Sequence, residues 1–432
     1  MNARSMLDYL GTEKAIRKLS TIYGDQAAAQ AKRYQELAFM HERRYGDRSG
    51  LVICSAPGRT EIAGNHTDHQ RGRVLAAAVD LDTLCAATPN AQMRVTLWSD
   101  GYQKPFIVDL NDLDVHEDEK ETTLSLIRGV ASRMQQLGYK IGGFDAEVSS
   151  TVFKGSGLSS SAAFEVMLVS VFDALFNGFK IDAQTRAVIS QYAENEYFGK
   201  PSGLLDQMAS SVGGLVTMDF REEKAKIEAL SYDFAAKGYV LCVVAAGGDH
   251  GNLTNEYAAI PKEMREVAEA LGGKVLTDIK PDVMEQKIPV LKGKVSDRAI
   301  LRALHFYDED QRIPQLVEAI KQDQLPEFLA LIVASGDSSQ RLLQNLYVPG
   351  RDNQEMTLAL ELSRRMLEKD GAWRIHGGGF AGTILAFVPK DALDAYRARM
   401  DSVFGEGATT VLSVRPVGPA VIGLQSAPHL RA

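Results

Sequence analysis

A short run rich in glycine and serine leads directly into a long apolar segment near the middle of the chain. The run covers residues 154–161, KGSGLSSS, and residues 162–176 after it are apolar on nearly all sides. A helix without a polar face has to be buried, and glycine lets the preceding backbone approach another group closely. The sequence therefore predicts a loop that opens onto a buried helix.

Composition limits the class of protein. The 432 residues are 45% hydrophobic and 24% charged, as in a soluble globular protein, and their number fits two domains. The formal net charge is -8 and no block of lysine and arginine occurs, so we expect no nucleic-acid partner. The cysteines Cys54, Cys85 and Cys242 are widely spaced, which favours buried thiols over a zinc site or a disulfide framework.

The chain shows no targeting or membrane signal. Its N-terminal sequence carries charges throughout and lacks the apolar core of a secretory signal. Apolar runs such as residues 239–246 are shorter than the roughly 20 residues that a membrane helix needs. We therefore expect a cytoplasmic protein with no membrane partner.

The hydrophobic pattern alternates between the periods of helices and strands. It predicts helices over residues 27–44, 123–137, 162–176 and 183–196, and strands over residues 51–55, 74–87, 94–98, 144–148 and 239–246. Ala56-Pro57-Gly58 predicts a turn after the first strand. Long helices with charged faces follow the last of these strands up to about residue 369, before a turn and strand over residues 374–388. We predict an N-terminal extension (1–24), a first domain (25–236) and a second domain (237–432).

The glycine-serine run suits a bound anion. Backbone N–H groups in such a loop can point at one ligand, and the following helix adds about half a positive charge at its N-terminus. Phosphate is a natural ligand for this arrangement, although the same turn can simply connect two elements. The run is not GxxxxGKT, so it is not a Walker-type loop.

Two carboxylates are candidates for the chemistry of phosphoryl transfer. Asp206 follows a glycine-bearing turn and has the apolar neighbours Leu204 and Leu205. It either orients an acceptor hydroxyl or caps a helix that starts near Gln207. Glu194 is either a hard oxygen ligand for Mg²⁺ or a glutamate on a solvated helix face.

Residues 56–70, APGRTEIAGNHTDHQ, form a dense cluster of short polar side chains after the first strand. Sugar hydroxyls both donate and accept hydrogen bonds, so Asp, Asn and His recognise them well. Arg59 supplies a permanent positive charge for a carboxylate or a transferring phosphoryl group. His66 and His69 lack the further His or Cys residues that a zinc site needs.

These motifs resemble those of the galactokinase family of the GHMP kinases. Residues 56–70 resemble its signature APGRVNLIGEHTDYN, residues 155–163 its loop GxGLSSSAA, and residues 374–382 its glycine motif GARxTGxGFGG. Shorter stretches resemble QxAE (residues 191–194), GxMDQ (203–207) and SEY (256–257). The motifs occur in family order between about residues 30 and 385, which argues against chance similarity.

The resemblance implies a fold and a reaction. The fold is an α+β, two-domain GHMP kinase, with an N-terminal ribosomal-S5-domain-2-like domain, a C-terminal ferredoxin-like domain and the active site in the cleft between them. The implied reaction is that of an ATP-dependent sugar 1-kinase, most simply a galactokinase that forms galactose 1-phosphate and ADP. ATP and Mg²⁺ are the implied cofactors, a small-molecule sugar is the partner, and a monomer is expected.

The resemblance also assigns roles to residues. Asp206 is the catalytic carboxylate and Arg59 its positive partner, while Ser160 and Glu194 hold Mg²⁺. The sugar-binding residues are Glu61, Asn65, His66, Asp68, Gly203 and Tyr257. The ATP-binding residues are Lys154, Gly155, Ser156, Gly157, Leu158, Ser159, Ser160, Ser161 and Ala162, with Lys154 either reaching phosphate or facing water.

Three departures from the family leave the sugar open. Asn65 replaces the glutamate that binds the sugar's 6-hydroxyl, His69 replaces a tyrosine, and Glu61 replaces an asparagine. One hypothesis is an exchange that keeps one carboxylate and one amide in the pocket. The other is that the missing carboxylate favours a uronic acid, as in a galacturonokinase, because a 6-carboxylate would meet less repulsion. Other GHMP acceptors also remain.

A third alternative is a sugar- and ATP-binding sensor without catalysis. Proteins of that kind resemble the family but lose residues of the serine loop. Here Ser159, Ser160 and Ser161 are intact, and Asp206 and Arg59 are present. The sequence therefore favours an enzyme.

Overall fold

The computed structural model describes residues 1–432 except 153–156, 223, 248–252, 369, 381 and 425–432. The helices are α1 (Ala3–Leu10), α2 (Glu13–Tyr23), α3 (Ala27–Tyr45), α4 (Thr123–Gln136), α5 (Ser160–Phe172), α6 (Ala183–Tyr192), α7 (Leu205–Val212), α8 (Thr254–Ala270), α9 (Pro281–Leu291), α10 (Asp297–Lys321), α11 (Leu325–Ser338), α12 (Glu355–Leu367) and α13 (Leu393–Phe404). The strands are β1 (Val52–Ala63), β2 (Arg73–Pro89), β3 (Arg94–Ser99), β4 (Phe106–Asp109), β5 (Phe144–Ser150), β6 (Leu215–Asp219), β7 (Lys226–Leu230), β8 (Tyr239–Gly247), β9 (Ala372–His376), β10 (Gly382–Pro389), β11 (Thr409–Leu412) and β12 (Ala420–Ile422).

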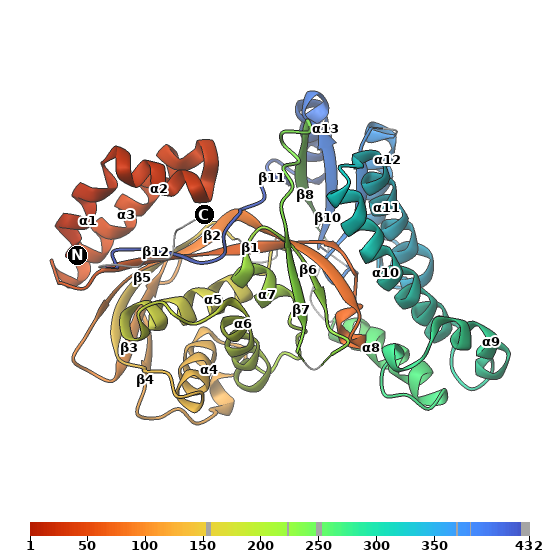
Figure 1. Ribbon diagram of the computed structural model, residues 1–432, viewed down its shortest axis with the longest axis horizontal. Coiled ribbons are helices and arrows are strands. Elements are labelled where there is room, and N and C mark those ends of the chain that lie inside the picture. The colour runs from red at the N-terminus through yellow and green to blue at the C-terminus, as the bar shows by residue number, and fades with distance from the viewer. Residues whose placement is uncertain (153–156, 223, 248–252, 369, 381, 425–432) are drawn as a thin grey trace.

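The strands form two sheets. The first has the order β12-β1-β2-β5-β3-β4, with β6 paired to β2 and β7 paired to β6. The second has the order β11-β8-β10-β9, and all of its neighbours are antiparallel. Helices α10 and α11 pack against each other beside the second sheet (Figure 1).

Helices cover both faces of the first sheet (Figure 1). Successive side chains of a strand point to opposite faces. Val52 and Cys54 of β1 accordingly belong to the core that contains α5, whereas Ile53 belongs to the core formed with α1 to α3. The long β1 therefore anchors a helical layer on each side of the sheet.

The predicted buried helix is α5. Its residues from Ala162 to Phe172 are buried except Phe164, and a short π-helical turn extends it to Asn177. The segment Ser160–Asn177 is long and apolar enough to cross a membrane, but 67% of it is buried inside the fold. A helix buried in a protein core can have the same composition, and α5 packs as a core helix here.

The predicted turn at Ala56-Pro57-Gly58 is wrong, because β1 continues through it to Ala63. Proline and glycine mark a β-bulge instead, seen as a shift in the β1–β2 register between Pro57 and Arg59. The Pro57 carbonyl accepts a 2.7 Å hydrogen bond from Ser210 of α7. The bulge changes the direction of the strand just before Arg59.

Residues 1–24, the predicted N-terminal extension, contain the helices α1 and α2. Met6, Leu10 and Leu19 pack in one core with Ile53 and Leu84 of the first sheet. At the other end of the chain, β12 pairs with β1. The boundary near residue 236 falls between β7 and β8 and stays a prediction, but the later segment returns a strand to the first sheet.

A buried carboxylate joins these N-terminal helices to the sheet. Asp82 of β2 is 0% exposed and pairs with Arg33 at 2.6 Å and with Arg415 at 3.1 Å. The hydroxyls of Tyr23 and Ser55 also donate to it. Burial alone would raise the pKa of Asp82, but the two arginines and these hydroxyls lower it below 3.8.

Replacing Asp82 by alanine should lower the free energy of unfolding by about 3–5 kcal/mol, because two arginines lose their buried partner. Urea unfolding measures the change. Glu222→Ala is the matched control, since Glu222 pairs with Lys226 on the surface and should contribute less than about 1 kcal/mol. Equal losses in the two variants would contradict this account.

Glu309 of α10 fixes the loop that follows β1. It is 0% exposed, and one carboxylate oxygen accepts from the Gly64 N–H at 2.9 Å and from Ser335 Oγ at 2.5 Å. Arg312 donates to the other oxygen. Burial alone would raise the pKa of Glu309, but Arg312 and its other partners lower it to about 2.

The lowered pKa of Glu309 predicts a pH dependence of stability. A carboxyl whose pKa falls from 4.5 to about 2 on folding stabilises the native state above pH 4.5 by roughly 3 kcal/mol, and this is lost as the pH falls toward 2. Urea unfolding at pH 7, 5 and 3 should show the advantage over Glu309→Gln shrinking below pH 4.5. A pH-independent advantage would contradict the prediction.

Candidate active site

An ion pair between β1 and α7 lies at the centre of the candidate site. Arg59 Nε donates to Asp206 Oδ1 at 2.6 Å, and Arg59 Nη1 donates to the Gly157 carbonyl at 2.5 Å. The Arg59 side chain is 7% exposed and that of Asp206 is 31% exposed. Arg59 is thus fixed by partners on two elements, while the carboxylate stays accessible.

The surroundings of Asp206 keep it ionised. Burial would raise its pKa, but the charge of Arg59 and hydrogen bonds from Arg59 and Ser159 lower the pKa below 3.8. Asp206 lies inside the first turn of α7 and its oxygens bind Arg59 and Ser159. The helix-cap interpretation of this residue is therefore wrong.

The described part of the predicted phosphate loop begins at Gly157, and Lys154, Gly155 and Ser156 lie outside the described residues. A Cβ on Gly157 would come within 2.3 Å of Thr383 Oγ1, so only glycine fits against β10 there. Gly157 and Leu158 both contact Arg59 through their carbonyls.

The loop ends at the N-terminus of α5. Ser159 has the left-handed backbone (φ 55°), its side chain makes no cap bond to the helix, and its hydroxyl donates a hydrogen bond to Asp206. The first N–H groups of a helix have no partner within it. The N–H groups of Ser160, Ser161 and Ala162 are the first of α5. This end of the helix is therefore suited to binding an anion.

Glu194 is buried, so the solvated-face interpretation is wrong. It is 2% exposed and lies in the π-helical turn after α6. One carboxylate oxygen, Oε1, accepts from Ser161 Oγ and from Lys200 Nζ, each at 3.0 Å. The other, Oε2, accepts from Ser202 Oγ and Gln207 Nε2, each at 2.7 Å.

The donor set around Glu194 fits one Mg²⁺. Among the described residues no three His, Cys, Asp or Glu side chains gather as metal ligands. Mg²⁺ in kinases, however, needs only one or two protein oxygens beside phosphate and water. Glu194 and Ser161 bring two oxygens within 3.0 Å, and the Lys200 ammonium shows that this point attracts a cation. The nearby hydroxyl is that of Ser161, whereas the sequence indicated Ser160.

Sequence reasoning missed a buried carboxyl behind this site. Glu165 of α5 is 0% exposed, and Gln207 Nε2 donates to it at 3.2 Å and to Glu194 at 2.7 Å. Burial and the nearby charge of Glu194 raise the pKa of Glu165 well above its usual range. Its position four residues after Ser161, on the same helix face, was the available signal.

Glu61 and Asn65 contact each other. Asn65 Nδ2 donates to Glu61 Oε1 at 3.0 Å and to the Gly377 carbonyl at 2.8 Å. Arg374 pairs with Glu61 at 3.0 Å, and Asn345 donates to Asn65 Oδ1 at 2.8 Å. Asn65 is only 1% exposed and Glu61 6%. The pair thus joins the first sheet to the glycine motif after β9.

His66 and Tyr257 reach the same glycine motif. His66 Nε2 lies 3.0 Å from the Gly378 carbonyl, and Tyr257 Oη donates to the Gly379 carbonyl at 2.8 Å. Burial, with a smaller effect of the stacked His69 ring, lowers the pKa of His66 to about 3. The imidazole is therefore neutral at pH 7, and its Nε2–H donates a hydrogen bond to the Gly378 carbonyl.

Gly203 and Asp68 are in close contact. A Cβ on Gly203 would come within 1.9 Å of Asp68 Oδ2, so a larger residue would displace this carboxylate. Gly203 lies three positions before Asp206. The loop after β1 and the turn before α7 thus bring predicted sugar-binding and catalytic residues together.

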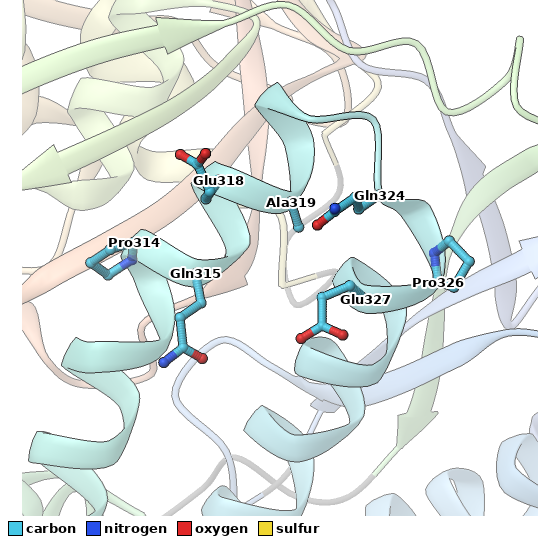
Figure 2. Close-up of a pocket in the computed structure, with 7 residues that line it drawn as sticks. All are labelled: Pro314, Gln315, Glu318, Ala319, Gln324, Pro326 and Glu327. Atoms are coloured by element: carbon cyan, nitrogen blue, oxygen red, sulfur yellow. The ribbon is translucent and has the colours of Figure 1, made fainter.

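A separate hollow of about 710 Å³ lies between α10 and α11 (Figure 2). It is open, and its lining contains none of the side chains predicted for catalysis or binding. The lining residues are Pro314, Gln315, Glu318, Ala319, Gln324, Pro326 and Glu327.

Comparison with known proteins agrees with this geometry. A model described as the galactokinase galactose-binding signature matches residues 40–89, which include Arg59, and the GHMP kinases N terminal domain matches residues 125–214, which include Glu194 and Asp206. The chain is 29% identical over 372 residues to a galactokinase of Glaesserella parasuis serovar 5, covering 82% of this chain and 90% of that protein. It is 26% identical over 379 residues to a galactokinase of Actinobacillus pleuropneumoniae serotype 5b, covering 84% and 92%.

Solved structures share the fold. Lactococcus lactis galactokinase complexed with galactose matches with a TM-score of 0.77 and 22% identity, over 88% of this chain and 98% of that one. Methanococcus jannaschii mevalonate kinase matches with a TM-score of 0.61 and 15% identity, over 85% and 99%. These matches confirm the predicted α+β fold of the GHMP kinases. The two family models and the relatives above make this chain similar to the galactokinase family of the GHMP kinases.

Proposed function

We propose that the protein is an ATP-dependent galactokinase, which transfers the γ-phosphoryl group of ATP to O1 of galactose and forms galactose 1-phosphate and ADP. The observation that carries this proposal is the Arg59–Asp206 pair beside the N-terminus of α5. It places an accessible carboxylate next to a helix end suited to phosphate. The relatives named galactokinase favour galactose over a uronic acid.

Asp206 orients the acceptor hydroxyl in this proposal. Its lowered pKa makes it a weak base, and the loose transition state of phosphoryl transfer needs little activation of the nucleophile. The hydroxyl therefore donates a hydrogen bond to Asp206, and its proton passes to that carboxylate as the new P–O bond forms and the bond between the γ-phosphorus and ADP breaks. Arg59 keeps the carboxylate ionised until then.

The loop and α5 hold the phosphates. The N–H groups at the start of α5 donate hydrogen bonds to the phosphates, while Glu194 and Ser161 would hold Mg²⁺. At this position a bound Mg²⁺ would neutralise negative charge on the phosphates. Tyr257 and His66 position the glycine motif near the sugar. We place the enzyme in the cytoplasm, as a monomer.

Replacing Asp206 by asparagine should lower kcat by about 10²–10⁴-fold, because the hydroxyl loses its proton acceptor. ADP release with Mg·ATP and galactose measures the rate. Asp323→Asn is a matched control, since Asp323 pairs with Lys237 on the surface, and its rate should stay unchanged. Full activity in Asp206→Asn would overturn the assignment.

The buried Glu61–Asn65 contact predicts the result of exchanging them. Asn65→Glu alone would place two buried carboxylates in contact, so its Tm should fall by several degrees and activity on galactose should drop. The double variant Glu61→Asn/Asn65→Glu restores one carboxylate and one amide and should recover part of both. If the single variant is stable and merely changes sugar preference, the pair is not the structural junction described above.

A further inference from the structure

Glu194 and Asp206 are paired with different kinds of cation, a lysine and an arginine. The Glu194 side chain is 3% exposed, and three of its four hydrogen-bond donors are neutral groups, on Ser161, Ser202 and Gln207. The fourth is the Lys200 ammonium, 3.0 Å from Oε1. Among the described residues, Lys200 is the one cation paired with Glu194. A buried carboxylate needs such a partner.

Lys200 is held to the site only at its two ends. Its backbone N–H donates to the Glu194 carbonyl at 3.1 Å, after a left-handed Gly199 (φ 86°). Its side chain is 58% exposed, whereas that of Arg59 is 7% exposed and makes two bonds. A lysine is a flexible point charge and arginine a rigid fork. Arg59 is therefore a fixed cation and Lys200 can leave its partner.

Lys200 binds the same carboxylate oxygen that faces Ser161. Oε1 accepts from both Ser161 Oγ and Lys200 Nζ at 3.0 Å, so a metal ion held by Glu194 and Ser161 would meet the ammonium. Like charges at such a distance repel strongly where little water screens them. The ammonium and a divalent cation cannot both occupy this position.

We propose that Lys200 is an exchangeable counter-ion, which neutralises Glu194 while the metal is absent and yields its place when Mg²⁺ arrives with ATP. This inference rests on the proposed function, because it needs the metal at Glu194. Lys200 then stabilises the metal-free enzyme and weakens its selectivity for metal-loaded nucleotide. Once displaced, the ammonium is free beside the bound phosphates. Lys200 is thus a positioning residue.

The experiment compares wild type with Lys200→Met. Isothermal titration calorimetry gives Kd for the non-hydrolysable analogue AMP-PNP in EDTA and in excess MgCl₂. The Kd in EDTA divided by the Kd in MgCl₂ measures how much the metal strengthens nucleotide binding. The ratio should rise about tenfold in Lys200→Met, the effect of one charge-assisted hydrogen bond. An unchanged ratio would overturn the inference.

Thermal unfolding in EDTA provides a second readout. Lys200→Met should lower Tm by about 2–4 °C because Glu194 loses its counter-charge, and Mg·AMP-PNP should reverse the loss. Lys200→Arg retains the charge and should retain the Tm. The control Lys226→Met removes a lysine that pairs with exposed Glu222 and should leave both readouts unchanged. A Tm loss that Mg·AMP-PNP leaves in place would contradict the exchange.

The Glu194→Gln background separates the two levels of inference. If Glu194 is the metal ligand, this variant loses the benefit of metal, and adding Lys200→Met changes nothing further. If Glu194→Gln keeps the wild-type ratio, the metal site in the proposed function fails, and the inference fails with it. A response to Glu194→Gln without one to Lys200→Met rejects only the exchange.

Discussion

The site depends on a single buried guanidinium. Arg59 joins β1 to Asp206 of α7 and to the Gly157 carbonyl, so three segments far apart in the sequence take their relative positions from one side chain. A buried charge is stable only with good partners, and the bulge after Pro57 directs β1 toward them. The same pairing keeps Asp206 ionised, so the structural and the chemical roles of Arg59 cannot be separated.

A second set of buried polar contacts joins the two sheets. Arg374 reaches Glu61, and His376 Nε2 lies 3.0 Å from Thr60 Oγ1. Burial lowers the pKa of His376 well below 6.5, so it joins the sheets as a neutral group. Asn65 also belongs to this junction. The departures from the family sequence at Glu61 and Asn65 therefore change the contacts between the two sheets.

Elements whose conformation depends on the local hydrophobic pattern could be predicted from the sequence. The helix at residues 27–44, the strand at 74–87 and the buried helix α5 follow from hydrophobic period and flanking glycine. The predicted turn at Pro57 was wrong because α7 and β2, which are distant in the sequence, hold the strand extended. The sequence analysis also assigned no structure to α1 and α2, which form by packing against the first sheet. Residue types indicated Glu194, but only the packing of α5 distinguishes Ser161 from Ser160 and brings Lys200 to the same oxygen.

The pairing of β12 with β1 has a consequence for synthesis on the ribosome. These partners are separated by about 360 residues, which at about 5–20 residues per second take on the order of 20–70 s to translate. During that time one edge of β1 has no strand beside it, a state prone to wrong pairing. Lys18 of α2 later donates to the Val421 carbonyl at 3.0 Å. Helices α1 and α2 are thus made well before β12, and until then β1 keeps an unpaired edge in the nascent chain.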